Sequence, residues 1–420
     1  MGESGTHDTG PLQAPGVMSR RLLFLTPDLP YPPHQGAAIR TLNLIKNLAP
    51  RYEIHLLSLV QERDISGRVE ALAHHCATIV TVPSPHRSTA RRAMSVLLSP
   101  SPDMALRLPS PEFSNALRIS LLRERFDFVQ IEAIEMAQYG LAVKSMKLPS
   151  QPLVVFDDIN AEYLLQKRAF EADVRQPSRW LAALYSFIQW RKLQRYESHT
   201  CRQLDRIVVV SEADAEALQS LVPALQCAVV PNGVDTDFFR PWEPADSDTT
   251  LVFTGKMDFR PNVDAVLWFA RQVLPLIQRE MPQVSLKVVG RNPHPRLQGL
   301  QRSSNIMLTG YVDDVRPYIG EAAVYVVPLR VGGGTRLKLL EAMSMAKAIV
   351  STSLGCEGIP VRSDRELVIA DDPVSFSRAV VTLMKDRERR AQLGISAREL
   401  ALSEHDWRQI TPLLERVYES

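Results

Sequence analysis

The residues best suited to chemistry lie together, directly after an apolar run that ends at Val327. Three glycines, a hydroxyl, two cations and a carboxylate follow that run: Gly332, Gly333, Gly334, Thr335, Arg336, Lys338 and Glu341. Glycines let the backbone approach a ligand closely and aim its N–H groups at it. A helix that begins at Thr335 would add unpaired donors and a partial positive charge, which suit a phosphate. Because Lys338 and Glu341 share one helix face, the stretch is suited to a nucleotide or a nucleotide-sugar.

The same stretch also has a purely structural interpretation. A glycine-rich turn between a strand and a helix can serve only as a tight connection, and Lys338 and Glu341 would then form a surface ion pair. The spacing matches neither G-x-G-x-x-G nor G-x-x-x-x-G-K-[ST]. A dinucleotide fold and a P-loop kinase are therefore disfavoured.

Length and composition limit the remaining classes. A chain of 420 residues exceeds one ordinary core, so two domains are expected. The content of 45% hydrophobic and 23% charged residues is typical of a globular protein, and the formal net charge of +2 gives no argument for nucleic acid. Four scattered cysteines lack C-x-x-C spacing: Cys76, Cys201, Cys227 and Cys356. Neither a zinc site nor a disulfide framework is indicated, and a reducing compartment fits best.

The first residues, 1–18, are rich in Gly, Pro, Ser and Thr and have no apolar core. We therefore expect a disordered leader and not a signal peptide. No apolar run approaches the roughly 18 residues that a membrane-spanning helix needs. A cytoplasmic location is expected from these two observations.

Short apolar strands alternate with helical patterns along the whole chain. In the first half the expected strands are 21–26, 54–60, 78–82, 128–131, 153–156, 207–210 and 228–230, and 178–203 is expected to be one extended helix. In the second half they are 251–254, 284–289, 306–309, 322–327, 348–351 and 367–369, with a helix over 262–278. Nearly continuous Val, Ile and Leu in such strands predict parallel sheets covered on both faces.

The composition turns to proline and acid between Arg240 and Thr249, which marks the best domain boundary. We predict an N-terminal Rossmann-like domain over 19–238, a linker over 239–249 and a C-terminal Rossmann-like domain over 250–404. A last helix within 405–420 is expected to pack back on the first domain. Two doubly wound α/β domains would then face each other across a cleft, where the carboxyl ends of the strands meet.

Four segments, in this order and spacing, carry a family resemblance: 30–36 (PYPPHQG), 210–214 (VSEAD), 230–235 (VPNGVD) and 332–343, which ends in Leu-Glu-Ala-Met. On these segments the chain resembles, from about Arg20 to its end, a glycosyltransferase of the GT-B fold. The group is the large retaining family 4, also called glycosyl transferases group 1, of the kind found in bacterial polysaccharide biosynthesis. The resemblance implies a C-terminal domain that binds a nucleotide-sugar and an N-terminal domain that binds the acceptor.

The resemblance also implies roles for the donor-binding residues. Glu341 would accept hydrogen bonds from the ribose hydroxyls, which suits a carboxylate facing a cis-diol. The glycine loop with Thr335 would offer donors to the β-phosphate and the sugar, and Arg336 and Lys338 would offset the charge of the diphosphate.

One further glycine follows the first strand of each predicted domain: Gly36 in the first and Gly255 in the second. The resemblance implies that Gly36 and Gly255 bring the backbone close to the donor. Lys256 stands at the position of the family's phosphate-binding arginine; the alternative is an ordinary solvated lysine.

The chain departs from the family pattern at three positions. Pro261 stands where a lysine is usual, and Arg260 is a candidate substitute. Gly333 lies eight residues before Glu341, so the first carboxylate of the Glu-x7-Glu signature is missing. Ile159 replaces the histidine of Asp-x-His-Asn-x-Glu, so no histidine can donate there.

On the acceptor side, Gln35, Asp158 and Asn160 are the candidate contacts. The alternative for Asp157, Asp158 and Asn160 is that they cap the helix that follows their strand. The acid pairs 157–158, 313–314 and 371–372 are interpreted as strand ends or helix caps and not as a metal motif.

Retaining relatives need no protein nucleophile. The acceptor hydroxyl attacks on the face that the diphosphate leaves, and a diphosphate oxygen takes its proton. The protein then supplies positioning and stabilisation of the departing charge. Because protein cations can meet that charge, neither a metal nor a cofactor is expected.

One basic segment admits two interpretations. Within 85–98 it mixes cations with apolar side chains: Arg87, Arg91, Arg92, Met94, Val96, Leu97 and Leu98. Such a segment fits a surface that docks on the cytoplasmic membrane near a lipid-linked acceptor. It fits an ordinary solvated helix equally well.

The leading hypothesis is a retaining hexosyltransferase that uses a nucleotide-diphosphate sugar and a glycan or lipid-linked acceptor. A nucleotide-sugar epimerase is the nearest other enzyme, but it would need a histidine and carboxylates around the sugar. A non-catalytic GT-B protein that only binds nucleotide-sugar is kept open by Gly333 and Ile159. The sugar, the base and the acceptor do not follow from the fold.

Overall fold

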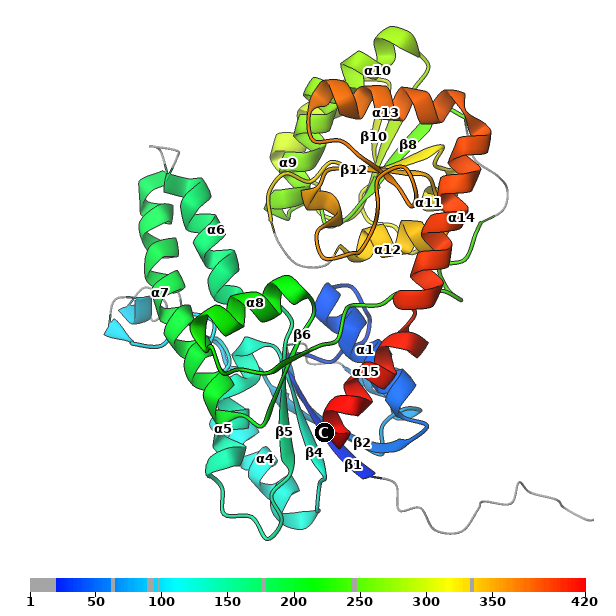
Figure 1. The fold of residues 1–420 in the computed structure, drawn as a ribbon. Coiled ribbons are helices and arrows are strands. Elements are labelled where there is room, and N and C mark those ends of the chain that lie inside the picture. The colour runs from blue at the N-terminus through cyan, green and yellow to red at the C-terminus, as the bar shows by residue number, and fades with distance from the viewer. Residues whose placement is uncertain are drawn as a thin grey trace, which may run out of the picture.

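The computed structural model describes residues 20–61, 65–88, 94–96, 98–174, 179–242, 248–332 and 336–420. Two parallel sheets, one in each half of the chain, form two α/β domains (Figure 1). This arrangement confirms the predicted fold class of two doubly wound domains. The predicted leader 1–18 and the predicted site residues Gly333, Gly334 and Thr335 lie outside the described residues.

The first sheet has seven strands in the order β3-β2-β1-β4-β5-β6-β7. They are β1 (Arg20–Thr26), β2 (Tyr52–Val60), β3 (Thr78–Pro83), β4 (Phe128–Glu132), β5 (Leu153–Asp158), β6 (Arg206–Val209) and β7 (Cys227–Val229). The helices are α1 (Gly36–Leu48), α2 (Ser66–Ala73), α4 (Pro111–Arg123), α5 (Ala137–Ser145), α6 (Glu162–Val174), α7 (Trp180–Gln203) and α8 (Glu212–Leu221). The strand order reverses between β1 and β4, and open α/β sheets bind ligands at the carboxyl ends beside such a reversal.

The second sheet repeats the plan with six strands in the order β10-β9-β8-β11-β12-β13. They are β8 (Thr250–Thr254), β9 (Ser285–Val289), β10 (Ile306–Leu308), β11 (Val324–Val327), β12 (Ile349–Ser351) and β13 (Val368–Ile369). The helices are α9 (Arg260–Trp268), α10 (Leu274–Glu280), α11 (Arg316–Glu321), α12 (Leu337–Ser344), α13 (Pro373–Lys385) and α14 (Arg387–Glu404). The reversal here lies between β8 and β11, so the loops after these two strands meet at one point.

Two predicted helices differ in detail from those observed. The helix expected over 262–278 is α9 and α10 joined by a π-helical turn, Phe269–Val273. The helix expected to begin at Thr335 begins at Leu337, with Arg336 at the N-cap position. Arg336 therefore lies on the approach to α12 and not within its first turn. The extended helix predicted over 178–203 is confirmed by α7.

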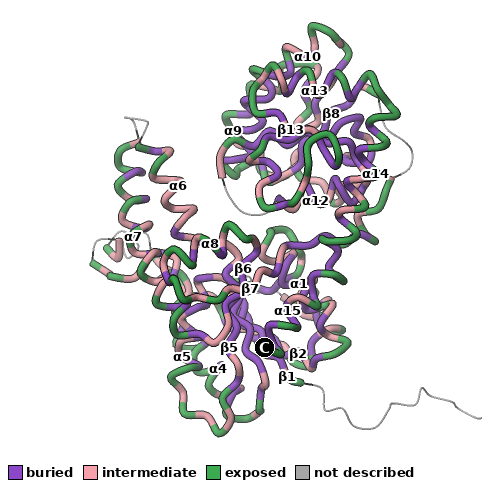
Figure 2. Tube along the Cα trace, in the orientation of Figure 1, coloured by how far each residue is buried: buried purple, intermediate pink, exposed green. Residues whose placement is uncertain are grey.

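The last helix, α15 (Trp407–Glu419), lies against the first domain (Figure 1). Its apolar face joins the core under the first sheet through five side chains: Trp407, Ile410, Leu414, Val417 and Tyr418. The Tyr418 ring stacks on Phe128 of β4 with a centroid distance of 4.8 Å. A Cβ atom at Gly233 would lie 2.8 Å from the Trp407 ring, so only glycine lets the chain pass this close. The central strands of both sheets are buried in Figure 2, as expected for sheets with helices on both faces.

A buried ion pair holds α1 against β5. Arg40 and Asp157 are both fully buried, and Arg40 Nε lies 2.8 Å from Asp157 Oδ2. Arg40 also donates to the carbonyl of Pro231 at 3.0 Å and to Asn232 Oδ1 at 3.2 Å. The guanidinium thus fixes three separate segments at the edge where the chain leaves the first domain.

Replacing Arg40 with alanine should lower the free energy of unfolding by about 3–5 kcal/mol, because it leaves the Asp157 carboxylate buried without its cation. The control is Lys385→Ala, which breaks the exposed Lys385–Glu280 pair and should cost at most about 1 kcal/mol. Urea unfolding followed by circular dichroism measures both. Equal losses in the two variants would contradict a structural role for the buried pair.

Candidate active site

The glycine that follows the first strand of the second domain lies at the reversal of that sheet. Gly255 has a φ of +150°, which other residues rarely adopt. A Cβ atom on it would lie 2.6 Å from Lys338 Nζ and 2.8 Å from Asn262 Nδ2. Gly255 therefore lets the backbone come close to a lysine that arrives from α12.

That lysine is held by an amide. Lys338 Nζ donates to Asn262 Oδ1 at 2.8 Å, and Asn262 Nδ2 in turn donates to the carbonyl of Lys256 at 2.9 Å. The ammonium also lies 4.1 Å from the centre of the Phe253 ring, a favourable cation–π position. Loop 255–259, the start of α9 and the first turn of α12 thus converge on the Lys338 amine.

Burial changes the titration of both predicted charged residues on α12. Loss of water, reinforced by the nearby Arg336, lowers the pKa of Lys338 to about 7, although Glu341 opposes this change. Loss of water raises the pKa of Glu341 to about 7, and Lys338 opposes that change. No ion pair joins the two groups among the contacts of the described residues. Strongly shifted pKa values are typical of functional sites, and both side chains are partly buried, so the surface ion-pair interpretation is disfavoured.

Arg336 is buried at the entry to α12, with 7% of its surface exposed. Burial lowers the pKa of its guanidinium; Glu357 opposes this effect, and Arg168 of α6 adds to it. Gly332 has a φ of +111°, and a Cβ atom there would lie 3.1 Å from the Pro261 ring. The loop after β11 is therefore packed tightly against the start of α9.

Two cations follow β8, Lys256 in the loop and Arg260 at the start of α9, and they have different partners. The Lys256 side chain is about half exposed, and its Nζ lies 3.6 Å from Asp258 Oδ1. Arg260, the candidate substitute for the missing lysine, lies 3.2 Å from Asp173 Oδ1 of α6 in the first domain. Arg260 thus joins the two domains, and Lys338 is the cation that reaches Gly255.

The first domain meets this site along two elements. A Cβ atom on Gly36, at the start of α1, would lie 3.6 Å from Leu337 Cδ1 at the start of α12. Gln35 and Gly36 are exposed beside that contact. On α6, Arg168 Nη2 lies 3.2 Å from Glu357 Oε1 of the second domain. The loop before α1 and helix α6 thus border the predicted donor-binding residues.

The predicted acceptor residues lie at the end of β5. Asn160 is half-buried, and its Nδ2 donates to Glu162 Oε1 at 3.3 Å. Asp158 is fully buried, and burial, together with Glu197 and Glu162, raises its pKa well above the ordinary value. In this conformation the Asp158 carboxylate does not reach the protein surface, so its contact with an acceptor stays a prediction.

The interpretation of Asp157 and Asp158 as caps of the helix that follows β5 is wrong. Asp157 is bound to Arg40, and Asp158 is the last residue of β5. The backbone N–H of Tyr163, in the first turn of α6, donates instead to the Glu197 carboxylate at 3.1 Å. A residue of α7 therefore caps α6. By contrast, Asp372 does cap α13, as its acid pair was predicted to do.

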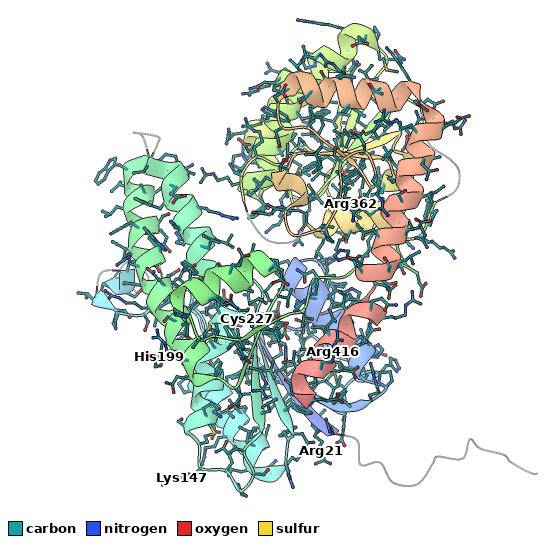
Figure 3. All side chains as sticks on the ribbon, viewed as in Figure 1. Arg21, Lys147, His199, Cys227, Arg362 and Arg416 are labelled. Atoms are coloured by element: carbon teal, nitrogen blue, oxygen red, sulfur yellow. The ribbon has the colours of Figure 1, made fainter. Side chains whose placement is uncertain are left out.

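Three residues of this region were missed by the sequence reasoning. Asn262 and Glu162 lie close to Pro261 and Ile159, two positions where the chain departs from the family pattern, yet neither was assigned a role. Burial and the neighbouring Glu135 raise the pKa of Glu162 to about 7. Arg168 has no sequence signal, because its partner Glu357 lies 189 residues away. Figure 3 shows side chains of both domains in the space between them.

Two absences apply to the described part of the chain. No group of three or more His, Cys, Asp and Glu side chains is arranged to hold a metal ion there. Among the same residues, no helix combines the length and the apolar character that crossing a membrane would require.

Comparison with protein families gives two adjacent matches. The family described as Glycosyltransferase Family 4 matches residues 34–238, and Glycosyl transferases group 1 matches residues 248–386. An uncharacterized 44.6 kDa protein in the cps region of Klebsiella pneumoniae is 20% identical over 93% of this chain and 97% of its own length. A GDP-mannose-dependent α-(1-6)-phosphatidylinositol monomannoside mannosyltransferase of Mycobacterium tuberculosis is 25% identical over 44% of this chain and 54% of its own.

Solved structures show the same fold at low identity. Sucrose-phosphate synthase from Thermosynechococcus elongatus superposes with a TM-score of 0.71 at 16% identity, over 95% of this chain and 98% of its own. Anabaena HepE, solved in complex with UDP and glucose, has a TM-score of 0.66 at 12% identity, over 95% and 99% of the two chains.

The raised pKa of Glu341 predicts a pH-dependent stability. Between about pH 4.5 and 7 the folded chain keeps a proton that the unfolded chain loses, so this contribution to stability disappears as the pH rises through 7. The unfolding free energy of the wild type minus that of Glu341→Gln should therefore fall across this range. Glu280→Gln, on the exposed end of α10, should give a flatter difference. A Glu341→Gln difference that is independent of pH would contradict the shift.

Proposed function

Because the chain belongs to the glycosyltransferases that join a family 4 domain to a group 1 domain, we propose that it transfers a hexose with retention of anomeric configuration. The donor is a nucleotide-diphosphate sugar, and the acceptor is a hydroxyl of a glycan or a lipid-linked saccharide. The observation that carries the proposal is the convergence of Gly255, Lys338 and Glu341 at the reversal of the second sheet.

Each of these residues has a proposed task. Glu341 accepts hydrogen bonds from the two ribose hydroxyls of the donor. Lys338 faces the diphosphate beside the backbone of Gly255, and the negative charge of the ligand draws its amine toward the protonated state. Arg336 and Lys256 add positive charge around the leaving group. The glycine loop with Thr335 is proposed to donate backbone hydrogen bonds to the phosphate and the sugar.

The chemistry needs no protein nucleophile. The bond between the anomeric carbon and the β-phosphate oxygen breaks, and the acceptor oxygen bonds to the same face of that carbon. The acceptor proton passes to an oxygen of the departing nucleoside diphosphate. The protein stabilises the charge that develops on the leaving group, which is commonly the largest catalytic contribution. No metal or cofactor is assigned a step.

The acceptor is proposed to lie against the first domain. Gln35, at the start of α1, and Asn160 with Glu162, after β5, border the space opposite the donor residues. Asp158 supports this wall from beneath. Closure of the domains would exclude water, which otherwise competes as an acceptor.

The biological setting is proposed from the relatives. One lies in a capsule (cps) region, one is a mannosyltransferase acting on a phosphatidylinositol mannoside, and HepE binds UDP. We propose a role in bacterial exopolysaccharide or surface polysaccharide synthesis, in the cytoplasm and at the cytoplasmic face of the membrane.

The donor site is tested by a thermal-shift panel with UDP, GDP, ADP and dTDP. One nucleotide should raise the melting temperature of the wild type, and Glu341→Ala should weaken its binding by about 10- to 100-fold, because two hydrogen bonds to a charged group are lost. Glu280→Ala, a carboxylate at the exposed end of α10, is the matched control. A panel without any shift would contradict the proposed donor site.

The stereochemistry is tested without knowing the acceptor. Given an α-linked donor alone, the enzyme should hydrolyse it slowly and release the α-anomer of the sugar first. Proton NMR of the anomeric signal, recorded before mutarotation, measures this outcome. Initial release of the β-anomer would contradict a retaining mechanism.

A further inference from the structure

Large apolar side chains are exposed together on the hairpin of α6 and α7. Seven of them lie there or on the neighbouring segment, and each has between 41% and 78% of its surface exposed: Met94, Leu98, Val174, Trp180, Leu181, Leu184 and Phe187. Figure 1 shows this hairpin projecting from the first domain, and Figure 2 shows exposed and partly exposed positions along both helices. Single exposed apolar residues are ordinary, but such a group marks an interaction surface.

The outer face of α7 has two chemically different halves. Trp180, Leu184 and Phe187 follow helical spacing on one face, and the next exposed residues on that face are Arg191 and Arg195. The opposite face of the helix is buried in the domain. The outer face thus begins apolar at the tip of the hairpin and becomes basic toward its base.

Carboxylates are almost absent from this face. The one carboxylate of α7, Glu197, is fully buried and accepts from the N–H of Tyr163. On α6 the exposed Glu171 lies 3.8 Å from Lys167, which offsets its charge. The outer face therefore presents a net positive charge.

The segment that carries Met94 and Leu98 lies beside α7. Lys192 of α7 donates to the carbonyl of Val96 at 2.7 Å, which holds this segment with Met94 and Leu98 against the helix. Arg87 belongs to the segment that was predicted to dock on a membrane. Its Nη1 lies instead 2.8 Å from Oδ1 of the buried Asp103. The other predicted residues of the segment, Arg91, Arg92 and Leu97, lie outside the described residues.

The other side of the hairpin lies beside the candidate active site. Arg168 and Asp173 of α6 pair with Glu357 and Arg260 of the second domain. A partner that binds the outer face of α7 would therefore lie close to the space between the domains.

We propose that the outer face of α7, together with Met94 and Leu98, docks on an anionic lipid bilayer. The apolar side chains enter the boundary between headgroups and acyl chains, and Arg191 and Arg195 contact anionic headgroups. Charge favours lipid over a second copy of the chain, because two copies would bring together two cationic faces that lack carboxylates. The benefit of docking, access to a lipid-linked acceptor, rests on the proposed function, but the binding itself does not.

Flotation of the full chain with vesicles tests the proposal. The vesicles are phosphatidylcholine alone and phosphatidylcholine with about one-third phosphatidylglycerol, at low and high salt. The wild type should float with the anionic vesicles, and more weakly at high salt. The double variant Leu181→Glu with Leu184→Glu should bind at least about tenfold more weakly. Ile395→Glu is the matched control, because Ile395 on α14 and Leu184 are both 50% exposed.

A second pair of variants tests the charge. Arg191→Gln and Arg195→Gln should each weaken binding to anionic vesicles by about fivefold. Absence of flotation, equal binding to neutral vesicles, or wild-type binding by the glutamate variant would overturn the proposal. A dimer seen by light scattering that the glutamate variant abolishes, without flotation, would assign the face to a second copy. Nucleotide binding by the same samples shows whether the proposed function stands independently.

Discussion

The close packing of the partly buried Lys338 amine against Gly255 is the constraint on which the rest of the candidate site depends. Lys338 sits beside Gly255, and any side chain at that glycine would occupy its place. Asn262 must be an acceptor toward the lysine and a donor toward the Lys256 carbonyl at the same time, which an amide does well. An amine with a pKa lowered to about 7 can gain its charge when an anion arrives. This property supports the proposal that Lys338 faces the diphosphate of the donor.

Contacts between the two domains border the candidate site. The chain crosses between them at 231–234 and again before α15, and the buried Arg40 binds the first crossing to β5 and α1. Helix α6 reaches the second domain through two ion pairs. The Arg168–Glu357 pair is half-exposed and therefore weak, whereas Arg260 pairs with the buried Asp173. Contacts as few as these suit domains that close around a ligand. The same helix joins this border to the exposed face of α7.

Much of the fold could be predicted from the sequence, because strands buried on both faces are nearly continuous runs of Val, Ile and Leu. The site could be predicted only where its residues are close in sequence, as Lys338 and Glu341 are. Lys338 and Asn262 are 76 residues apart, and no sequence pattern predicts that they form a hydrogen bond. The role of Arg260 was open for a similar reason, since its partner belongs to the other domain. Burial of Asp158 depends on how α6 and α7 cover the end of β5, and helical periodicity does not say which face is covered. The predicted helix 178–203 was found, but its exposed apolar face became visible only in the structure.

The most direct test of the central claim compares a nucleoside with its diphosphate. Calorimetry would give the affinities for the nucleotide selected by the panel and for the same nucleoside without phosphates. In Lys338→Met the preference for the diphosphate should fall by about 10- to 100-fold, because a charge-assisted contact to phosphate is lost. In Glu341→Ala both affinities should fall together, because the ribose contact serves both ligands. An unchanged preference in Lys338→Met would contradict the account, since it would place the diphosphate away from this lysine.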